Sequence, residues 1–135
     1  MSAFESDTAA KPIAPGRYAV ELSDQWWVGR GPNGGYVAAL MLRAMSHEVE
    51  SVAVSAASSA SGLAGRQPPR SLTVHFLNTP SVGAAEIEVT IERQGRSTTF
   101  LSARLIQKGD VQGKAMAVFS ADRHGPSFVN TVMPE

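Results

Sequence analysis

Residues 31–50 have the sequence GPNGGYVAALMLRAMSHEVE, and this stretch decides the fold because it predicts one long helix. Its apolar side chains recur at the i, i+3, i+4, i+7 and i+8 spacing of a single helical face, with polar side chains opposite. These apolar residues are Val37, Leu40, Met41, Ala44 and Met45. Asn33 precedes the first turn, and asparagine is among the best residues for capping a helix N-terminus. We therefore expect a helix over about 34–50, roughly 25 Å long.

Strand patterns lie on both sides of this helix. Before it, apolar and polar residues alternate over 17–22, which predicts a short, half-buried strand. After it, alternating segments lie at 72–76, 87–91, 101–105 and 113–121, joined by short turns. Short turns connect antiparallel neighbours, so the sequence predicts an α+β fold with one helix across one face of an antiparallel sheet. The second face then needs a cover, which predicts a homodimer or pairing with a second similar domain.

The predicted domain occupies 16–123. Residues 1–15 lack periodicity, which indicates a flexible N-terminal arm. In 51–67, ten of the 17 residues are Ala or Ser, so we expect a loose surface insertion there. Residues 124–135 have no clear period and are expected to form a C-terminal tail.

The composition excludes several functional classes. The 135 residues include 12 basic and 12 acidic side chains, so the formal net charge is zero, which disfavours nucleic-acid and anionic-membrane surfaces. The absence of cysteine excludes disulfides, thiolate nucleophiles and cysteine-ligated zinc. No apolar run approaches the ~20 residues of a membrane span, and the N-terminus lacks the pattern of a signal peptide. A cytoplasmic protein of one domain is therefore expected.

Three familiar motifs are present only in part. Gly29, Gly31 and Gly34 satisfy G-x-G-x-x-G, but the strands that follow form a meander rather than a parallel βαβ unit, so we reject dinucleotide binding. The pair His47 and Glu48 begins an H-E-x-x-H motif that is not completed, and we expect no metal site. The chain also contains no G-x-S-x-G motif of a serine hydrolase.

The glycines at the predicted helix start are the strongest candidate for chemistry. A helix N-terminus offers unpaired N–H groups and a partial positive charge, and Gly34 and Gly35 would let a ligand approach the backbone closely. Such donors suit a carbonyl group that becomes an oxyanion during attack. The alternative is that glycine only permits tight packing of the helix start against the sheet.

Three segments carry a resemblance to a known family: GPNGGYVAAL at 31–40, PRSLTVHFL at 69–77 and GRS at 95–97. They closely resemble the hot-dog acyl-CoA thioesterase family, in particular the N-terminal repeat of its thioesterase II-like, double hot-dog members. The resemblance implies a sheet wrapped around one long helix and a dimeric or double-domain unit. It also implies hydrolysis of fatty acyl-CoA thioesters in lipid metabolism, with no cofactor apart from the coenzyme A of the substrate.

The same resemblance assigns catalytic roles at the helix start. Asn33, Gly34 and Gly35 match a motif in which a glycine amide polarises the thioester carbonyl. We assign that amide to Gly35, with Gly34 allowing the approach and Asn33 able to orient a water molecule.

The resemblance assigns Tyr36, Arg96 and Ser97 to substrate binding, and Arg96 would meet a phosphate of coenzyme A. The alternative for Arg96 is an exposed turn residue. Family members place their water-activating Asp, Thr or Ser, and Gln in the C-terminal repeat, which this chain does not resemble. A second hypothesis therefore stays open: a non-catalytic hot-dog module that binds acyl-CoA or completes a partner domain.

Overall fold

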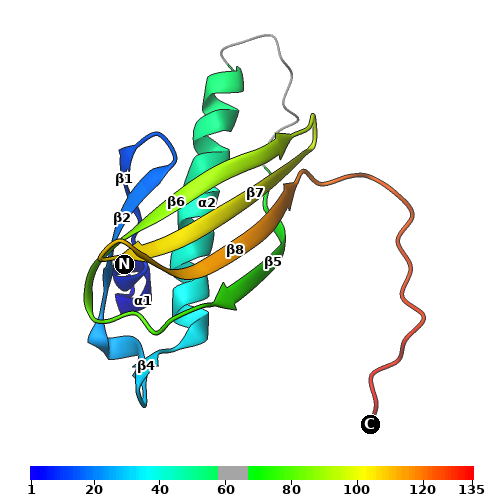
Figure 1. The fold of residues 1–135 in the computed structure, drawn as a ribbon. Coiled ribbons are helices and arrows are strands. Elements are labelled where there is room, and N and C mark those ends of the chain that lie inside the picture. Colours follow the sequence, from blue (N-terminus) through cyan, green and yellow to red (C-terminus); the bar gives the residue numbers. More distant parts are fainter. Residues whose placement is uncertain (58–66) are drawn as a thin grey trace.

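The computed structural model describes residues 1–57 and 67–135. Within these residues, six strands form one antiparallel sheet in the order β1-β2-β6-β7-β8-β5, crossed by the long helix α2 (Figure 1). The helices are α1 (Ala3–Asp7) and α2 (Gly34–Ala57), and a 3₁₀ turn spans Asp24–Trp26. The strands of the sheet are β1 (Lys11–Ala14), β2 (Arg17–Leu22), β5 (Pro69–Phe76), β6 (Gly83–Gln94), β7 (Thr98–Gln107) and β8 (Asp110–Ser120). A separate small hairpin pairs β3 (Trp27–Val28) with β4 (Gly31–Pro32).

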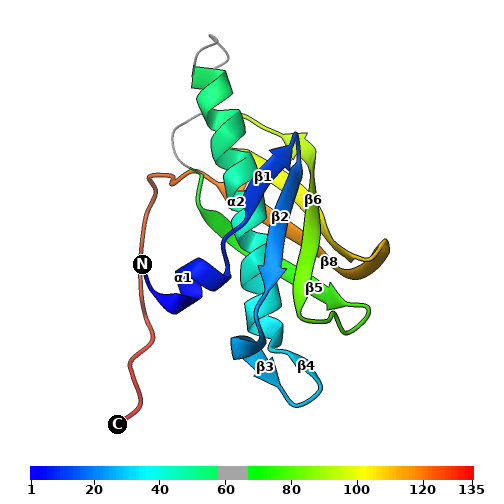
Figure 2. The same ribbon diagram turned by 90° about the vertical axis from the view of Figure 1, so that its left-hand side faces the viewer.

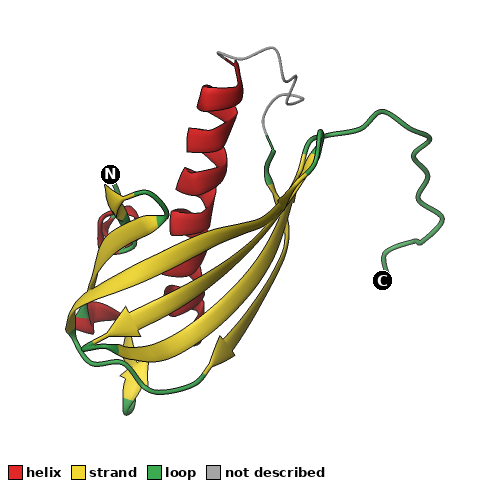
Figure 3. Ribbon diagram, turned by 45° about the horizontal axis from the view of Figure 1, so that its top comes forward, coloured by secondary structure: helices red, strands yellow, loops and turns green. Residues whose placement is uncertain are grey.

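The hydrophobic core lies between α2 and one face of the sheet. The helix covers that face, and the sheet curves around it (Figures 2 and 3). All five residues of the apolar stripe identified in the sequence are buried in this core. Alternate residues of the strands meet them, including Ile87, Leu101, Leu105 and Phe119. The structure thus confirms the α+β architecture that the sequence predicts.

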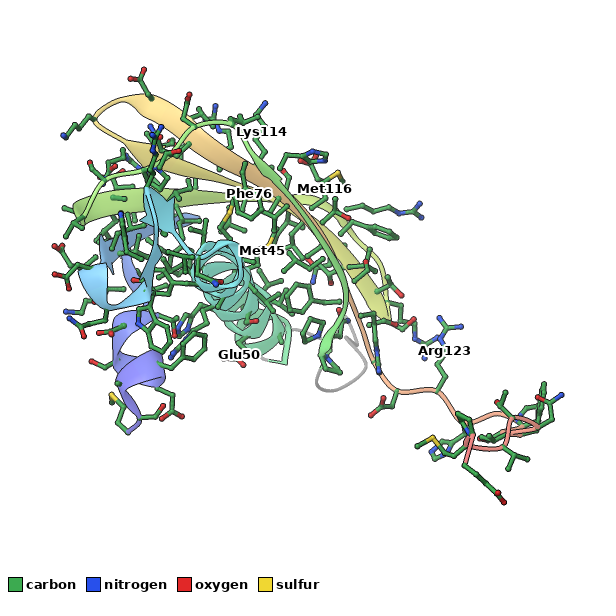
Figure 4. All side chains as sticks on the ribbon, turned by 90° about the horizontal axis from the view of Figure 1, so that it is seen from below. Met45, Glu50, Phe76, Lys114, Met116 and Arg123 are labelled. Atoms are coloured by element: carbon green, nitrogen blue, oxygen red, sulfur yellow. The ribbon has the colours of Figure 1, made fainter. Side chains whose placement is uncertain are left out.

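The other face of the sheet is mostly polar. Arg17 pairs with Glu86 across β2 and β6, and Arg104 pairs with Glu88 across β6 and β7. Met116 is the main apolar exception, with 58% of its surface exposed. Figure 4 shows Met116 and Lys114 on this face, whereas Met45 lies with the core. The outer face is therefore a solvated surface that bears a small apolar patch.

The N-terminal residues differ from the expected flexible arm. α1 begins with a capping box between Ser2 and Glu5, and β1 adds an edge strand to β2. Arg43 of α2 donates hydrogen bonds to the Glu5 carbonyl and to Thr8 Oγ1, both at 2.8 Å. Thr8 is fully buried. Contacts with α2 and with β2 thus order residues whose own sequence has little periodicity.

Two other boundaries also differ from expectation. α2 extends to Ala57, beyond the predicted end near residue 50, because the Ala/Ser-rich stretch continues the helix for two more turns. The rest of the expected insertion, 58–66, lies outside the described residues. The C-terminal residues 124–135 contain no helix or strand and are exposed throughout.

Candidate functional site

The chain enters α2 through the β3–β4 hairpin. Gly29 supplies the positive φ of +67° that the hairpin turn needs. Asn33 N–H then donates to the Trp26 carbonyl at 2.7 Å, which closes the loop. The side-chain Oδ1 of Asn33 accepts the Gly35 N–H at 2.8 Å, so Asn33 caps the helix as its sequence position predicts. The glycine-rich segment is therefore a hairpin and a cap, and not a dinucleotide loop.

The backbone donors at the helix start differ in availability. The Gly35 N–H, to which the sequence analysis assigns the carbonyl, is already bonded to Asn33. The N–H groups of Gly34 and Tyr36 have no acceptor among residues 1–57 and 67–135. Gly35 is exposed and Gly34 is half-buried. The Gly34 donor is thus unpaired within the described residues, whereas a ligand carbonyl could bond to the Gly35 donor only if the Asn33 side chain turned away.

The end of β5 packs against this helix start. A Cβ atom added to Gly34 would lie 3.1 Å from Cζ of Phe76, so the aromatic ring rests directly over the glycine. A Cβ atom on Gly31 would lie 2.6 Å from the Thr79 methyl group. Tight packing against the sheet, the alternative explanation for the glycines of the helix start, is therefore observed at Gly34, whereas a Cβ atom on Gly35 would meet only the Asn33 side chain. It also gives the free donor of Gly34 an apolar neighbour, which strengthens a hydrogen bond by excluding water.

Tyr36 is a core residue. Only 2% of its surface is exposed, and its ring stacks on Trp26 with 6.0 Å between the centroids. Its hydroxyl donates toward the carbonyls of Asp7 and Glu21 and accepts the Ser23 N–H. Burial raises the pKa of this hydroxyl above its ordinary value. Instead of lining an accessible surface, Tyr36 fixes the loop that leads into the helix start.

Arg96 and Ser97 lie at the opposite end of the molecule from the helix start. They form the β6–β7 turn, whereas α2 begins beside the far end of β5 (Figures 1 and 3). Ser97 Oγ accepts a hydrogen bond from Arg123 at 2.6 Å. One copy of the chain therefore does not bring the predicted catalytic and substrate-binding residues together. Arg123 is a further residue of this turn region that the sequence patterns do not reveal, because it follows the last predicted strand, where no periodicity remains.

The helix start lacks an evident base. No hydrogen bond joins a carboxylate to Asn33, Gly34 or Gly35 in the described part of the chain. The carboxylate of Glu48, farther along α2, has a structural partner, since it accepts the Tyr18 hydroxyl at 2.6 Å. Burial, then the hydrogen bond and charge of Glu48, raise the pKa of Tyr18. The described residues also contain no group of three or more His, Asp or Glu side chains that could hold a metal ion.

A cavity of about 770 Å³ lies elsewhere. It opens beside β2, β6 and the β7–β8 turn, and its charged lining includes Lys11, Arg17, Glu86 and Lys108. None of the six predicted site residues lines it. We therefore choose the helix start as the candidate site because of its backbone donors, and not because of a cavity. In the described residues, no helix is long and apolar enough to cross a membrane.

Comparisons with known proteins agree with the resemblance in the sequence. The family model of the acyl-CoA thioesterase N-terminal domain matches residues 22–121. The thioesterase-like protein TwmA of Talaromyces wortmannii is 32% identical over 108 residues. A hot-dog protein of unknown function from Alicyclobacillus acidocaldarius has a TM-score of 0.76 at 29% identity, and a candidate thioesterase II from Thermobifida fusca has 0.73 at 26%. The hot-dog fold is thereby confirmed.

The chain is shorter than these similar proteins. The match to the fungal protein covers 78% of this chain but 27% of that protein. Each of the two solved structures is matched by the whole of this chain, which covers 46% of the longer molecule. The similarity thus concerns one hot-dog unit of proteins that are about twice as long or longer.

Proposed function

The chain belongs to the acyl-CoA thioesterase N-terminal domain family, and from this membership we propose that it binds acyl-CoA thioesters at the start of α2 and takes part in their hydrolysis. The observation that carries the proposal is the free Gly34 N–H beside Phe76, at the end of a helix whose dipole favours negative charge. In hydrolysis a water oxygen bonds to the thioester carbonyl carbon, and the carbon–sulfur bond then breaks. The helix start would stabilise the oxyanion between these two events.

Of the two unpaired donors in the described residues, the Gly34 amide belongs to a half-buried residue and the Tyr36 amide to a buried one, so we take Gly34 as the donor available without rearrangement. The Gly35 amide joins it when the Asn33 side chain releases it, and the freed Oδ1 of Asn33 is then able to accept a hydrogen bond from the attacking water. Two donors on one oxyanion are the usual arrangement in acyl transfer, and each contributes roughly 10²–10³ in rate. This mechanism gives each residue of the Asn33-Gly34-Gly35 motif a distinct task.

The proton of the attacking water needs an acceptor that the helix start does not supply. We propose that a carboxylate of a second hot-dog unit accepts it, and that coenzyme A leaves as the thiol. The length of the similar proteins supports this proposal, because this chain covers 46% of the two solved structures. The second unit is either a further domain or a second copy.

The edge strand β5 is the surface on which we propose that the second unit docks. β5 pairs with β8 on one side and has no strand on the other within the described residues. An antiparallel neighbour would place its own Pro69 end beside the Phe76 end of this strand. The helix start of one unit would then face the β6–β7 turn of the other. Such pairing unites the two halves of the predicted site, which one chain holds apart.

A matched pair of variants tests the donor role. Gly34→Pro removes the N–H at the first helical position, where proline is well tolerated, and Gly34→Ala adds comparable bulk beside Phe76 while keeping the N–H. We expect Gly34→Pro to lower kcat by roughly 10²-fold relative to Gly34→Ala. Thiol release from short, medium and long acyl-CoA substrates measures the rate, and the absence of cysteine removes any protein background. Equal rates for the two variants would show that the Gly34 amide is not the donor.

A non-catalytic binding module is the second candidate function. The absence of a bonded carboxylate at the helix start, within the described residues, favours it. The natural chain would then release no thiol from any acyl-CoA, yet it would bind a thioether analogue of acyl-CoA in calorimetry. Thiol release by the purified chain would exclude this candidate, and absence of both release and binding would contradict both functions.

A further inference from the structure

The last residue of α1 is bonded to both ends of the segment that leads into the long helix. We call residues 26–36 the entry segment. The carboxylate of Asp7 accepts the indole N–H of Trp26 at 2.9 Å, where this segment begins. The main-chain carbonyl of Asp7 accepts the hydroxyl of Tyr36 at 3.0 Å, where the segment ends. One residue of α1 therefore holds the two ends of the entry segment together.

The entry segment is also closed by contacts within itself. The ring of Trp26 stacks on that of Tyr36, with 6.0 Å between the centroids and 20° between the planes. The Trp26 carbonyl accepts the Asn33 N–H at 2.7 Å, and Asn33 Oδ1 in turn accepts the Gly35 N–H at 2.8 Å. A continuous series of contacts thus joins Asp7 to the Gly35 amide, one of the donors of the candidate site.

α1 is attached to the long helix as well as to the entry segment. Figure 2 shows it beside α2, near the half of the helix that begins at Gly34. Arg43 of α2 donates to the Glu5 carbonyl, and Phe4 packs edge-on against Trp26 with 5.2 Å between the ring centroids. α1 precedes residues 22–121, the part of the chain that the family model matches. The contacts at the entry segment are therefore made by residues outside the matched part.

We propose that Asp7 is a positioning residue for the proposed hydrolysis, and that it acts through Trp26 on the backbone donors at the start of α2. This inference rests on the proposed function. Donors accelerate acyl transfer only when they point at the position where the oxyanion develops. A displacement of about 1 Å can lower the rate on the order of 10²-fold. The hydrogen bonds of Asp7 restrict such a displacement of Gly34 and Gly35.

Loss of the Asp7 carboxylate should affect turnover more than substrate binding. The backbone donors bond more strongly to the oxyanion than to the uncharged carbonyl, so their misplacement raises the reaction barrier. In the full chain, we expect Asp7→Ala to lower kcat for thiol release on the order of tenfold, with KM nearly unchanged. The main-chain carbonyl of residue 7 remains in this variant, so the bond to Tyr36 is retained.

Two further variants separate positioning from stability. Asp7→Asn keeps an oxygen that accepts the indole N–H, so it should restore kcat to nearly that of the unaltered chain. Asp24→Ala removes an exposed aspartate from the adjacent 3₁₀ turn and should change neither constant. Rates are compared at a temperature at which circular dichroism shows every variant to be folded. An unchanged kcat in Asp7→Ala would overturn the inference, and so would an equal loss in Asp7→Ala and Asp7→Asn.

Trp26→Phe tests the path by which Asp7 acts. This variant keeps a ring that can stack on Tyr36, but it loses the N–H that the Asp7 carboxylate accepts. It should lower kcat by the same factor as Asp7→Ala. The double variant should be no slower than either single variant, because all three lack the same hydrogen bond. Additive losses in the double variant would contradict an effect of Asp7 through Trp26.

Amide hydrogen exchange tests the positioning role without relying on activity. If Asp7 fixes the entry segment, the Asn33 N–H should exchange faster in Asp7→Ala, whereas the amides of β7 should exchange at an unchanged rate. This result in a chain that releases no thiol would support the effect of Asp7 on the helix start, and only the hydrolytic function would fail. Unchanged exchange at Asn33, in a chain that does release thiol, would contradict the role of Asp7 alone.

Discussion

At the scale of single residues, Asn33 caps the long helix, and the proposed reaction would give the same side-chain oxygen a second task. Its Oδ1 caps α2 by accepting the Gly35 N–H, and the proposed reaction requires that bond to open. The cap stabilises the unliganded chain, while the open state exposes a second donor to the substrate. Affinity for the carbonyl therefore includes the cost of breaking the cap.

Replacement of Asn33 should separate stability from activity. We expect Asn33→Ala to lower the free energy of unfolding by about 1 kcal/mol, because the Gly35 N–H loses its acceptor. Asn33→Asp keeps an acceptor and places a negative charge at the helix N-terminus, so its stability should stay close to that of the unaltered chain. Urea unfolding measures both values. A loss in Asn33→Asp as large as that in Asn33→Ala would contradict the capping role.

The two tyrosines predict a loss of stability at high pH. Both are buried, and burial raises the pKa of Tyr18 and of Tyr36 above the ordinary value of 10.0. The folded chain therefore holds these protons more tightly than the unfolded chain does. Their contribution to stability is complete below the unfolded pKa of about 10 and is lost as pH rises through the folded pKa values.

An absorbance titration checks this expectation. Because Tyr18 and Tyr36 are the only tyrosines, tyrosinate absorbance should stay low just above pH 10 in the folded chain and appear only as the chain unfolds. Tyr18→Phe should weaken the alkaline dependence of stability, leaving the part due to Tyr36. Reversible ionisation of both tyrosines near pH 10 with the fold intact would refute the expectation.

At the scale of elements, the attachment of the N-terminal segment to α2 depends on the side chain of Arg43. Arg43 of α2 donates to the Glu5 carbonyl and to Thr8, and it is the main polar link between α1 and the long helix. The Trp26 indole links α1 to the 3₁₀ turn by donating to Asp7 at 2.9 Å. α1 has five residues, too few to be stable without such contacts.

Loss of the Arg43 side chain should detach α1 from the long helix. Arg43→Ala is expected to lower the free energy of unfolding by roughly 1–2 kcal/mol, since two hydrogen bonds from a charged donor are lost. Amide exchange should become faster over α1 and stay unchanged over β6 to β8. Arg30→Ala, in an exposed turn, serves as the control. Unchanged exchange over α1 in Arg43→Ala would show that other contacts hold the segment.

The sequence predicts elements well where a local period exists. β2 begins and ends at the predicted residues because Tyr18, Val20 and Leu22 alternate strictly with polar residues. β1 gives no such signal, since all four of its residues are exposed. α1 has one local signal, the capping box between Ser2 and Glu5. Its position against the rest of the chain depends on contacts with Arg43 and Trp26, which are distant in the sequence. The pattern of residues 1–15 alone therefore cannot predict these contacts.

At the scale of the whole molecule, the candidate site is only partly encoded in local motifs. The helix-start motif predicts the cap and the close approach of the backbone. The engagement of the Gly35 amide by Asn33 and the position of Phe76 over Gly34 follow from three-dimensional packing. Arg123 meets Ser97 only because β8 returns the chain to the β6–β7 turn. Residues that meet through sheet pairing carry no spacing rule in the sequence.

Single cysteines in a chain without cysteine test the proposed pairing through β5. We expect oxidation to link two copies through one of three exposed positions, Ser71→Cys, Thr73→Cys or His75→Cys. The position nearest the two-fold axis should link fastest, because a disulfide needs Cβ atoms about 4 Å apart. Thr90→Cys, on the same face but in the interior strand β6, is the control. Preferential linkage through Thr90→Cys would contradict pairing at the β5 edge.

The order of strands in the sheet also has a consequence for how the chain folds. β6, β7 and β8 are consecutive in sequence and joined by short turns, one of which holds Lys108 and Gly109 at the positive φ of a tight hairpin. β2 and β5 instead pair with β6 and β8, which are distant from them in the sequence, and closing such long chain segments slows these contacts. We expect the three-stranded meander to form in the folding transition state, so that Leu105→Ala slows folding while Val20→Ala mainly speeds unfolding. Stopped-flow kinetics would reveal this order, in which β5, the edge at which we propose that a second unit docks, joins the sheet after the meander.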